Sequence, residues 1–244
     1  MPRANRYVVP GNVYHLTHRC HDREFLFKFA RDRDSYRQLL WRSLREFPVS
    51  VFAYCLTSNH THLLVRSESL PAMSRWMQQV EGEFAQAYNR RKHRSGAFWC
   101  DRYHCTMIEE GRHLWNCMVY VELNMVRAGV VVHPAQWHWC SCVEWMGTRQ
   151  RYRVVDQNGC LRLVGAVSVS QFRDNYEALI SRALAGENIV REARWTEGIA
   201  VGSRLFVEGI AQRATGRQEL EREEVGENAW VLRESQSEGG ATCG

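Results

Sequence analysis

His60 and His62, two histidines separated by a single residue, are the side chains of this sequence best suited to hold a metal ion. They begin a run, residues 60–65, that is rich in residues favouring strands. Side chains alternate between the two faces of a strand, so both imidazoles are expected on one face, with Thr61 on the other, core-facing side. The pair indicates a divalent-metal site, because imidazole is the commonest metal-ligating side chain. A structural role is the alternative, although burying a second imidazole without a partner is costly.

A second group of polar residues lies on the helix expected over residues 110–129. Its apolar positions, with spacings of 4, 3, 4 and 3, are Leu114, Met118, Val121, Met125 and Ala128, and Gly129 is a suitable stop. A different stripe carries Asn116, Tyr120, Asn124 and Arg127. Tyr120 and Asn124 are four residues apart and therefore neighbours on the helix surface. Ordinary solvent exposure explains such spacing equally well.

The elements that must position these side chains alternate in a recognisable order. We expect strands at residues 11–18, 49–56, 60–65 and 98–108, and helices at 31–47 and 70–88. The order strand–helix–strand–strand–helix–strand is that of the split βαβ, ferredoxin-like arrangement. The predicted fold class is therefore α+β, an antiparallel sheet with helices on one face and the histidine pair on the exposed face of an inner strand. His15, His18 and His21 are expected to form hydrogen bonds or face phosphate rather than to bind metal.

Charge is concentrated in the first part of the chain. Residues 1–155 contain 22 Lys and Arg against 13 Asp and Glu, whereas residues 156–244 contain 10 against 14. All ten histidines precede residue 139. A basic first domain favours a polyanionic partner, with nucleic acid the first candidate. The excess of Arg over Lys also fits a GC-rich genome.

Neither the cysteines nor the apolar runs point to an extracellular or membrane protein. The nine cysteines form no Cys-x-x-Cys pair, so reduced thiols are expected rather than a zinc site. No apolar run approaches the roughly 20 residues needed to span a bilayer. We therefore expect a cytoplasmic, nucleoid-associated protein.

Basic and aromatic residues are interleaved after the second expected helix. Residues 89–96 contain four formal positive charges, and Phe98, Trp99, Arg102 and Tyr103 follow closely. Such a stretch suits a segment that contacts phosphates and stacks nucleobases. A solvated basic face at a helix C-terminus is the alternative.

The pattern weakens after residue 147. Residues 148–158 suggest a basic linker, and helices are expected around residues 172–186 and 205–216. We predict a first domain at residues 1–147, a linker and helical appendage at 148–234, and a disordered tail at 235–244.

Several of these motifs resemble one family. Asn59-His60-Thr61-His62 resembles the histidine–hydrophobe–histidine (HUH) motif of single-tyrosine transposases. Residues 120–129, Tyr-Val-Glu-Leu-Asn-Met-Val-Arg-Ala-Gly, are similar to that family's Tyr-x-x-x-Asn-Pro-Val-Arg-Ala-Gly helix. Residues 14–19, 89–102 and 139–141 also match in position. The resemblance, to the REP-associated tyrosine transposases, covers about residues 6–147.

The sequence departs from the family pattern at four positions. Ser58 replaces a usual proline, Thr61 is more polar than usual, Met125 replaces the proline after Asn124, and Cys140 replaces a serine. None of these changes removes a catalytic atom.

The resemblance implies a mechanism and a substrate. His60 and His62 would hold Mg²⁺ or Mn²⁺ with Asn124 as third ligand, and Tyr120 would be the nucleophile that forms a 5′-phosphotyrosine link. The substrate would be single-stranded DNA with a small hairpin, of the repetitive extragenic palindrome type. The residues expected to contact this DNA are Arg19, Arg90, Arg91, Lys92, Arg94, Trp99, Arg102, Tyr103 and Arg127. Trp139 is a further stacking candidate, and both it and Trp137 could instead be core anchors; Arg127 could instead cap its helix.

Two rival interpretations remain open at this point. A non-catalytic nucleic-acid-binding regulator could have the same fold, and a metal hydrolase using water would leave Tyr120 without a role. The sequence is compatible with a monomer or a homodimer.

Overall fold

The computed structural model describes residues 9–186, 189–214, 219–226 and 228–235. The predicted tail at 235–244 lies outside these residues except for Ser235. In chain order the elements are β1 (Val13–Arg19), η1 (His21–Arg23), α1 (Ala30–Ser43), β2 (Ser50–Leu56), β3 (His60–Arg66), α2 (Leu70–Lys92), β4 (His104–Ile108), α3 (Arg112–Glu122), α4 (Asn124–Arg127), η2 (Pro134–Gln136), α5 (Cys142–Trp145), α6 (Gln157–Val164), α7 (Val169–Ala185), α8 (Arg194–Glu197), β5 (Ala200–Gly202), α9 (Arg204–Arg213), β6 (Leu220–Gly226) and β7 (Ala229–Glu234).

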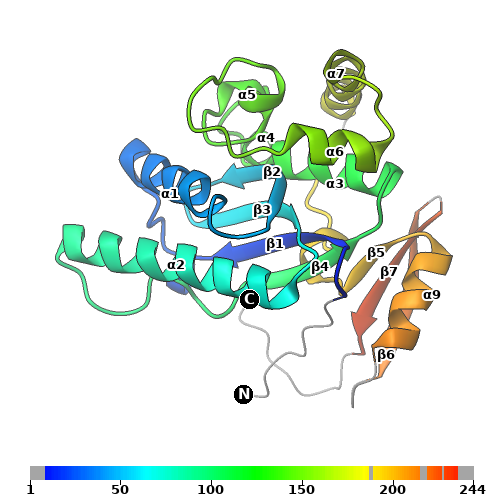
Figure 1. The fold of residues 1–244 in the computed structure, drawn as a ribbon, viewed down its shortest axis with the longest axis horizontal. Helices are drawn as coiled ribbons and strands as arrows, with labels where there is room; N and C mark the ends of the chain where they lie inside the picture. The colour runs from blue at the N-terminus through cyan, green and yellow to red at the C-terminus, as the bar shows by residue number, and fades with distance from the viewer. Residues whose placement is uncertain (1–8, 187–188, 215–218, 227, 236–244) are drawn as a thin grey trace.

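The sheet contains the predicted ferredoxin-like core. Strands follow the order β2-β3-β1-β4-β5-β7-β6, and β1 pairs antiparallel with both β3 and β4 (Figure 1). β3 is therefore an inner strand, with Thr17 opposite His62 and His15 opposite Leu64. The α+β fold class is confirmed.

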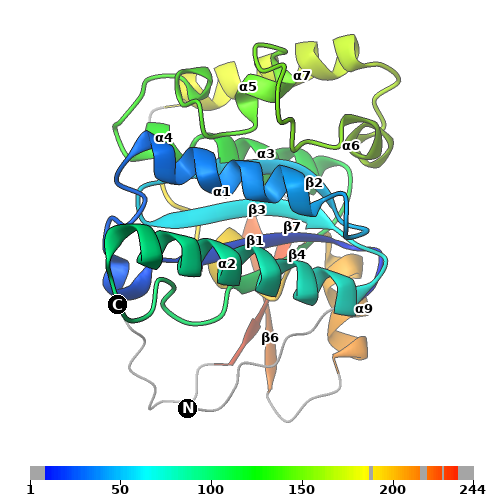
Figure 2. The same cartoon turned by 60° about the vertical axis from the view of Figure 1, so that its left-hand side comes forward.

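Helices cover both faces of the sheet rather than one. α1 and α2 lie side by side on one face, and α3 packs against β2 and β3 from the other (Figure 2). The alternation of β1 follows this division, because His18 bonds to Glu81 of α2 while His15 lies beside Tyr120 of α3. The face that presents the histidine pair is thus covered by the helix that carries Tyr120, where the sequence predicted an exposed face.

α2 begins where its local sequence predicts and runs four residues beyond the expected end at residue 88. The Ser69 hydroxyl accepts a hydrogen bond from the Ala72 N–H, and a proline occupies the first turn. The helix ends at His93, which adopts a left-handed conformation with φ of 48°.

Two predicted elements differ from the structure. The helix expected over residues 110–129 is interrupted at Leu123, where ψ is 4°, and continues as the single turn α4. The strand expected over residues 98–108 begins only at His104, because the preceding residues form a loop pinned by a bridge between Trp99 and Cys20.

The C-terminal region adds strands as well as helices. α7 and α9 confirm the two predicted helices, but β5 pairs parallel with β4, and the β6–β7 hairpin extends the sheet further. The stretch predicted as a linker is anchored, since the N–H groups of Val154 and Val155 donate to the buried Glu144 carboxylate. The boundary at residue 147 stays a prediction. Within the described residues, no helix has the length and apolarity required to cross a membrane.

Candidate active site

His60, His62, Asn124 and Tyr120 line one cavity of about 460 Å³. Arg19 and Arg127 also line it, together with Ala128 and four residues of the C-terminal region: Ile189, Val190, Arg191 and Thr196. The structure thus brings together six of the predicted site residues from β1, β3, α3 and α4. It also adds a C-terminal wall that sequence reasoning missed.

The hydrogen bonds of His60 fix its tautomer. Its Nδ1 lies 2.7 Å from the Asn59 Oδ1 and 3.0 Å from the Thr57 Oγ1. The Thr57 hydroxyl already donates to the His60 carbonyl, so both partners of Nδ1 act as acceptors. Nδ1 therefore carries the proton, and Nε2 retains its lone pair.

His62 is fixed by a chain of three contacts that ends on the backbone. The carbonyl of Trp195 can only accept, so His15 donates to it from Nδ1 at 2.7 Å. The His15 Nε2 is then the acceptor for the His62 Nδ1–H at 2.9 Å. The His62 Nε2 consequently keeps its lone pair, which accepts from the Asn124 amide nitrogen at 2.8 Å.

These imidazoles are neutral because they are buried among cations. Burial, assisted by Arg19 and Arg127, lowers the pKa of His60 to about 3. Burial is also the main cause that lowers the pKa of His15 to about 3. Burial and the neighbouring His60 lower the pKa of His62 well below its usual value. A metal ligand must be a neutral imidazole, so this electrostatic environment leaves both lone pairs available.

The side chains present, two imidazoles and one carboxamide, are suited to hold a divalent metal ion. The rings of His60 and His62 have centroids 4.8 Å apart, and half a turn of the Asn124 carboxamide exchanges its nitrogen for its oxygen beside the His62 Nε2. Over the residues that the structure describes, no cluster of three or more His, Cys, Asp and Glu side chains forms a metal site. The candidate ligand set of two imidazoles and one amide is therefore uncharged.

Tyr120 is nearly buried between the imidazoles and a tryptophan. Its ring centroid lies 6.1 Å from that of His62, 6.0 Å from that of His15 and 6.0 Å from that of Trp195. Burial raises its pKa, while Arg127 lowers it. The Arg127 guanidinium lies over the Tyr120 ring at 4.1 Å and donates to the Tyr120 carbonyl at 2.7 Å, across the break between α3 and α4.

The cavity is positively charged. Arg19, Arg127 and Arg191 line it, and none of the described residues that line it is an aspartate or glutamate. The nearest carboxylate partner of this group is Glu197, which pairs with Arg191. A cavity with this charge suits an anionic group such as phosphate.

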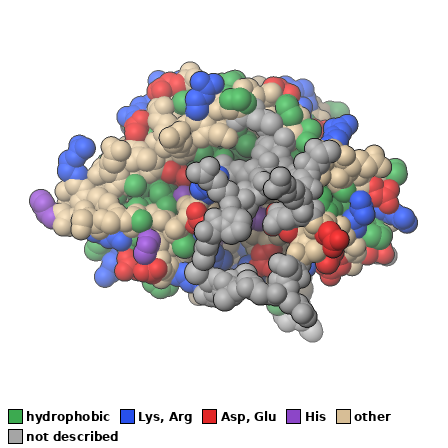
Figure 3. Space-filling view, turned by 90° about the horizontal axis from the view of Figure 1, so that it is seen from below, with side chains coloured by type: hydrophobic (Ala, Val, Ile, Leu, Met, Phe, Trp, Pro, Cys, Tyr) green, Lys and Arg blue, Asp and Glu red, His purple; other side chains and the backbone are tan. Residues whose placement is uncertain are grey.

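The remaining predicted DNA contacts lie outside the cavity, at the end of α2 and in the loop after it. Arg90, Lys92 and Arg102 are exposed. Arg91 is paired with the buried carboxylate of Asp32, and Arg94 donates to the Ala97 carbonyl at 2.9 Å. On the face seen from below, Lys and Arg are interspersed with Asp and Glu (Figure 3). Phosphate contact by these residues stays a prediction.

The aromatic residues predicted to stack bases make contacts within the protein, with Trp99 and Trp139 half-buried, and their stacking on bases stays a prediction. Trp99 stacks on His18 at 4.4 Å and donates to the Glu81 carbonyl, and Tyr103 is buried. Trp137 donates to the Leu56 carbonyl and Trp139 to the Asp34 carboxylate. These two tryptophans have the geometry of core anchors, the alternative that the sequence left open.

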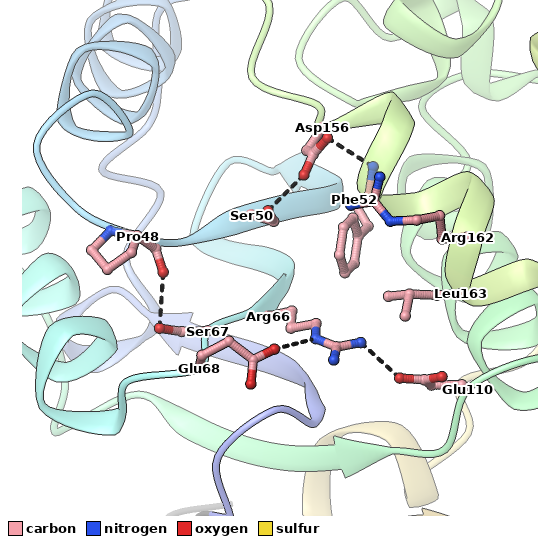
Figure 4. Close-up of a pocket in the computed structure, with 11 residues that line it drawn as sticks. Pro48, Ser50, Phe52, Arg66, Ser67, Glu68, Glu110, Asp156, Arg162 and Leu163 are labelled. Atoms are coloured by element: carbon pink, nitrogen blue, oxygen red, sulfur yellow. Dashed lines mark hydrogen bonds and ion pairs between the residues drawn. The ribbon is translucent and has the colours of Figure 1, made fainter.

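A second cavity of about 460 Å³ lies at the other ends of β2 and β3 (Figure 4). In this cavity Arg66 bridges Glu68 and Glu110, and the Ser50 hydroxyl donates to Asp156. It contains none of the predicted site residues.

Comparison with known proteins agrees with this fold. Residues 9–124 match the family model described as "Transposase IS200 like". Over these residues the chain is similar to the IS200-like transposases, which agrees with the resemblance seen in the sequence.

Among solved structures, the chain is similar to a REP-associated tyrosine transposase bound to a REP hairpin. The TM-score is 0.53 at 16% identity, covering 64% of this chain and 94% of that one. At this identity the likeness shows the fold. No curated protein matches the sequence.

Proposed function

We propose that this protein is a metal-dependent transposase that cleaves and rejoins single-stranded, hairpin-bearing DNA through a 5′-phosphotyrosine intermediate. The observation that carries the proposal is that Tyr120 lines the same cavity as His60, His62 and Asn124. The family match and the hairpin bound by the structural neighbour agree with it.

His60, His62 and Asn124 would hold a Mg²⁺ or Mn²⁺ ion. Such an ion supplies Lewis-acid polarisation of the scissile phosphate. The chain contributes the positioning, because the contacts of His60 with Asn59 and of His62 with His15 fix both rings. A ligand held in one orientation by its other ring nitrogen binds a metal more tightly.

Tyr120 acts as the nucleophile. Its phenol oxygen attacks phosphorus, and the bond from phosphorus to the 3′ oxygen breaks. The phenol loses one proton, and the departing 3′ oxygen gains one to become a hydroxyl. The product is a phosphodiester between Tyr120 and the 5′ side of the break, which conserves the bond energy for rejoining.

The three arginines of the cavity perform the electrostatic part of the reaction. Arg19 of β1 and Arg191, which precedes α8, both line the cavity and are suited to hold DNA phosphates. Arg127, over the Tyr120 ring, lowers the pKa of the phenol against the effect of burial. It therefore favours the ionised form that attacks.

The proposal is tested by trapping the covalent product. The protein is incubated with a labelled single-stranded hairpin and Mn²⁺, and the mixture is separated on a denaturing gel. A labelled band at the mass of protein plus DNA is expected for the native protein and for Tyr152→Phe, whose tyrosine is exposed and lies in the loop before α6. The band is expected to be absent for Tyr120→Phe and after chelation of the metal.

The alternative outcomes identify the rival functions. DNA binding without a covalent band in either metal supports a non-catalytic regulator. Cleavage that persists in Tyr120→Phe supports a hydrolase that uses water.

A further inference from the structure

The loop between β1 and α1 is fixed to the turn that precedes His60. The Phe27 N–H donates to the Ser58 carbonyl at 3.0 Å, and the Asn59 amide nitrogen donates to the Arg23 carbonyl at 3.1 Å. The loop therefore lies directly beside the strand that carries the two candidate metal ligands, and its position relative to them is set by backbone contacts.

This loop has an unusual backbone. Asp22 and Arg23 are consecutive non-glycine residues in the left-handed region, with φ of 48° and 56°. Such conformations are unfavourable for residues with a side chain and persist only where surrounding contacts impose them. Residues held in such conformations are found most often at functional sites.

The loop buries one phenylalanine and exposes two. Phe27 is fully buried, in contact with Tyr36 and Phe84, and anchors the loop in the core. Phe25 is 67% exposed and Phe29 is 52% exposed. Solvent exposure of two large aromatic rings on one short, anchored segment is typical of a binding surface rather than of a core.

Two ammonium groups near the Phe29 ring complement a nucleic acid. The Lys92 Nζ lies 4.3 Å from the centroid of the Phe29 ring, and the Lys28 Nζ lies 5.9 Å from it. Aromatic rings beside ammonium groups are the usual means of holding single strands, in which bases stack on the rings and phosphates meet the cations.

We propose that Phe25 and Phe29 form the surface on which unpaired bases of a single-stranded DNA stack as it passes the site. The proposal rests on the proposed function for its substrate class. It favours these rings over Trp99 and Tyr103, which make contacts within the protein, as the stacking residues. It also assigns a role to the β1–α1 loop, which contains no motif recognised in the sequence.

The test measures binding without chemistry. Tyr120→Phe is used as the background, without added metal, and its affinity for a hairpin with unpaired flanking bases is measured by fluorescence anisotropy. Phe25→Ala and Phe29→Ala are each expected to weaken binding about tenfold. Binding of a blunt duplex without unpaired bases is expected to be unchanged.

Two matched variants separate stacking from other effects. Leu205→Ala removes another exposed apolar side chain, 81% exposed on α9, and should leave binding unchanged. Phe29→Trp should retain the affinity and Phe29→Leu should lose it, because only an aromatic ring stacks. A 2-aminopurine placed among the unpaired bases should be quenched by the native loop and regain fluorescence in the double alanine variant.

The outcomes distinguish this proposal from the proposed function. If the double alanine variant binds as tightly as its background while the native protein still forms the covalent band, only the loop proposal is overturned. If Phe29→Leu retains full affinity, the proposal that bases stack on Phe29 is wrong. If the native protein binds no single-stranded DNA, both proposals fail together.

Discussion

Glu122 is a buried carboxyl whose ionisation should set a measurable pH dependence of stability. It is 1% exposed, it accepts from the Cys142 N–H at 2.9 Å, and its other oxygen contacts the Ser141 hydroxyl. The groups around it from neighbouring elements, Ser141, Cys142, Cys140 and Tyr176, are uncharged in their usual states. Burial therefore raises the pKa of Glu122 from 4.5 to about 7.

The upward shift of the Glu122 pKa determines how stability changes with pH. Because the folded-state pKa lies above the unfolded one, the native protein binds a proton that the unfolded chain has already released. The stabilisation is fully present below pH 4.5 and is lost as the pH rises through about 7. A shift of this size corresponds to about 3 kcal/mol.

Glu122→Gln removes the titration while keeping an oxygen that accepts from the Cys142 N–H. Relative to the native protein, the variant should gain about 3 kcal/mol of unfolding free energy between pH 4.5 and pH 8. The buried His15 and His60, with lowered pKa values, change stability in the opposite direction. Their effect cancels in the difference because both proteins contain them.

The assay is urea unfolding of both proteins at a series of pH values, with the difference in free energy plotted against pH. Glu177→Gln, at an exposed position of α7, is the matched control and should follow the native protein. A Glu122→Gln difference that is flat, or that decreases as the pH rises, would refute the reasoning.

Three further results are expected. His15→Gln should weaken Mn²⁺ binding about 10- to 100-fold, because His15 orients His62; an unchanged affinity in an electron paramagnetic resonance titration would contradict this. Arg91→Ala should lower the unfolding free energy by about 3 kcal/mol, because it leaves the buried Asp32 carboxylate without its ion-pair partner. Arg90→Ala should weaken DNA binding and its salt dependence without changing stability. Equal losses of unfolding free energy in the two variants would refute this distinction. Mn²⁺ should bind at least about tenfold more tightly when the DNA hairpin is present, because the protein ligands are uncharged and three arginines line the cavity; calorimetric titration giving equal affinities would show otherwise.

The core of the fold could be predicted from local patterns alone. Alternation placed β1, β2 and β3, helical periodicity placed α1 and α2, and Ser69 located the start of α2. Spacing also selected His60, His62, Tyr120 and Asn124, which the structure brings to one cavity. These features depend on neighbours in sequence, and such neighbours determine which face a side chain occupies.

The features that the sequence did not predict depend mainly on contacts between residues far apart in the chain. The break at Leu123 accompanies the Arg127 hydrogen bond to Tyr120, which no periodicity reveals. The β6–β7 hairpin has several charged residues in its strands and little alternation of apolar residues. His15 forms hydrogen bonds as predicted, but only the structure shows that one of its partners is His62.

The short segment from α8 to β5 has a practical consequence for anyone wishing to shorten this protein. It supplies the Trp195 carbonyl to His15, and Ala200 and Val201 pair with β4. Trimming the gene to the stretch that matches the family would therefore delete one end of the imidazole chain and part of the pocket wall. A compact tool derived from this chain should keep everything through Gly202.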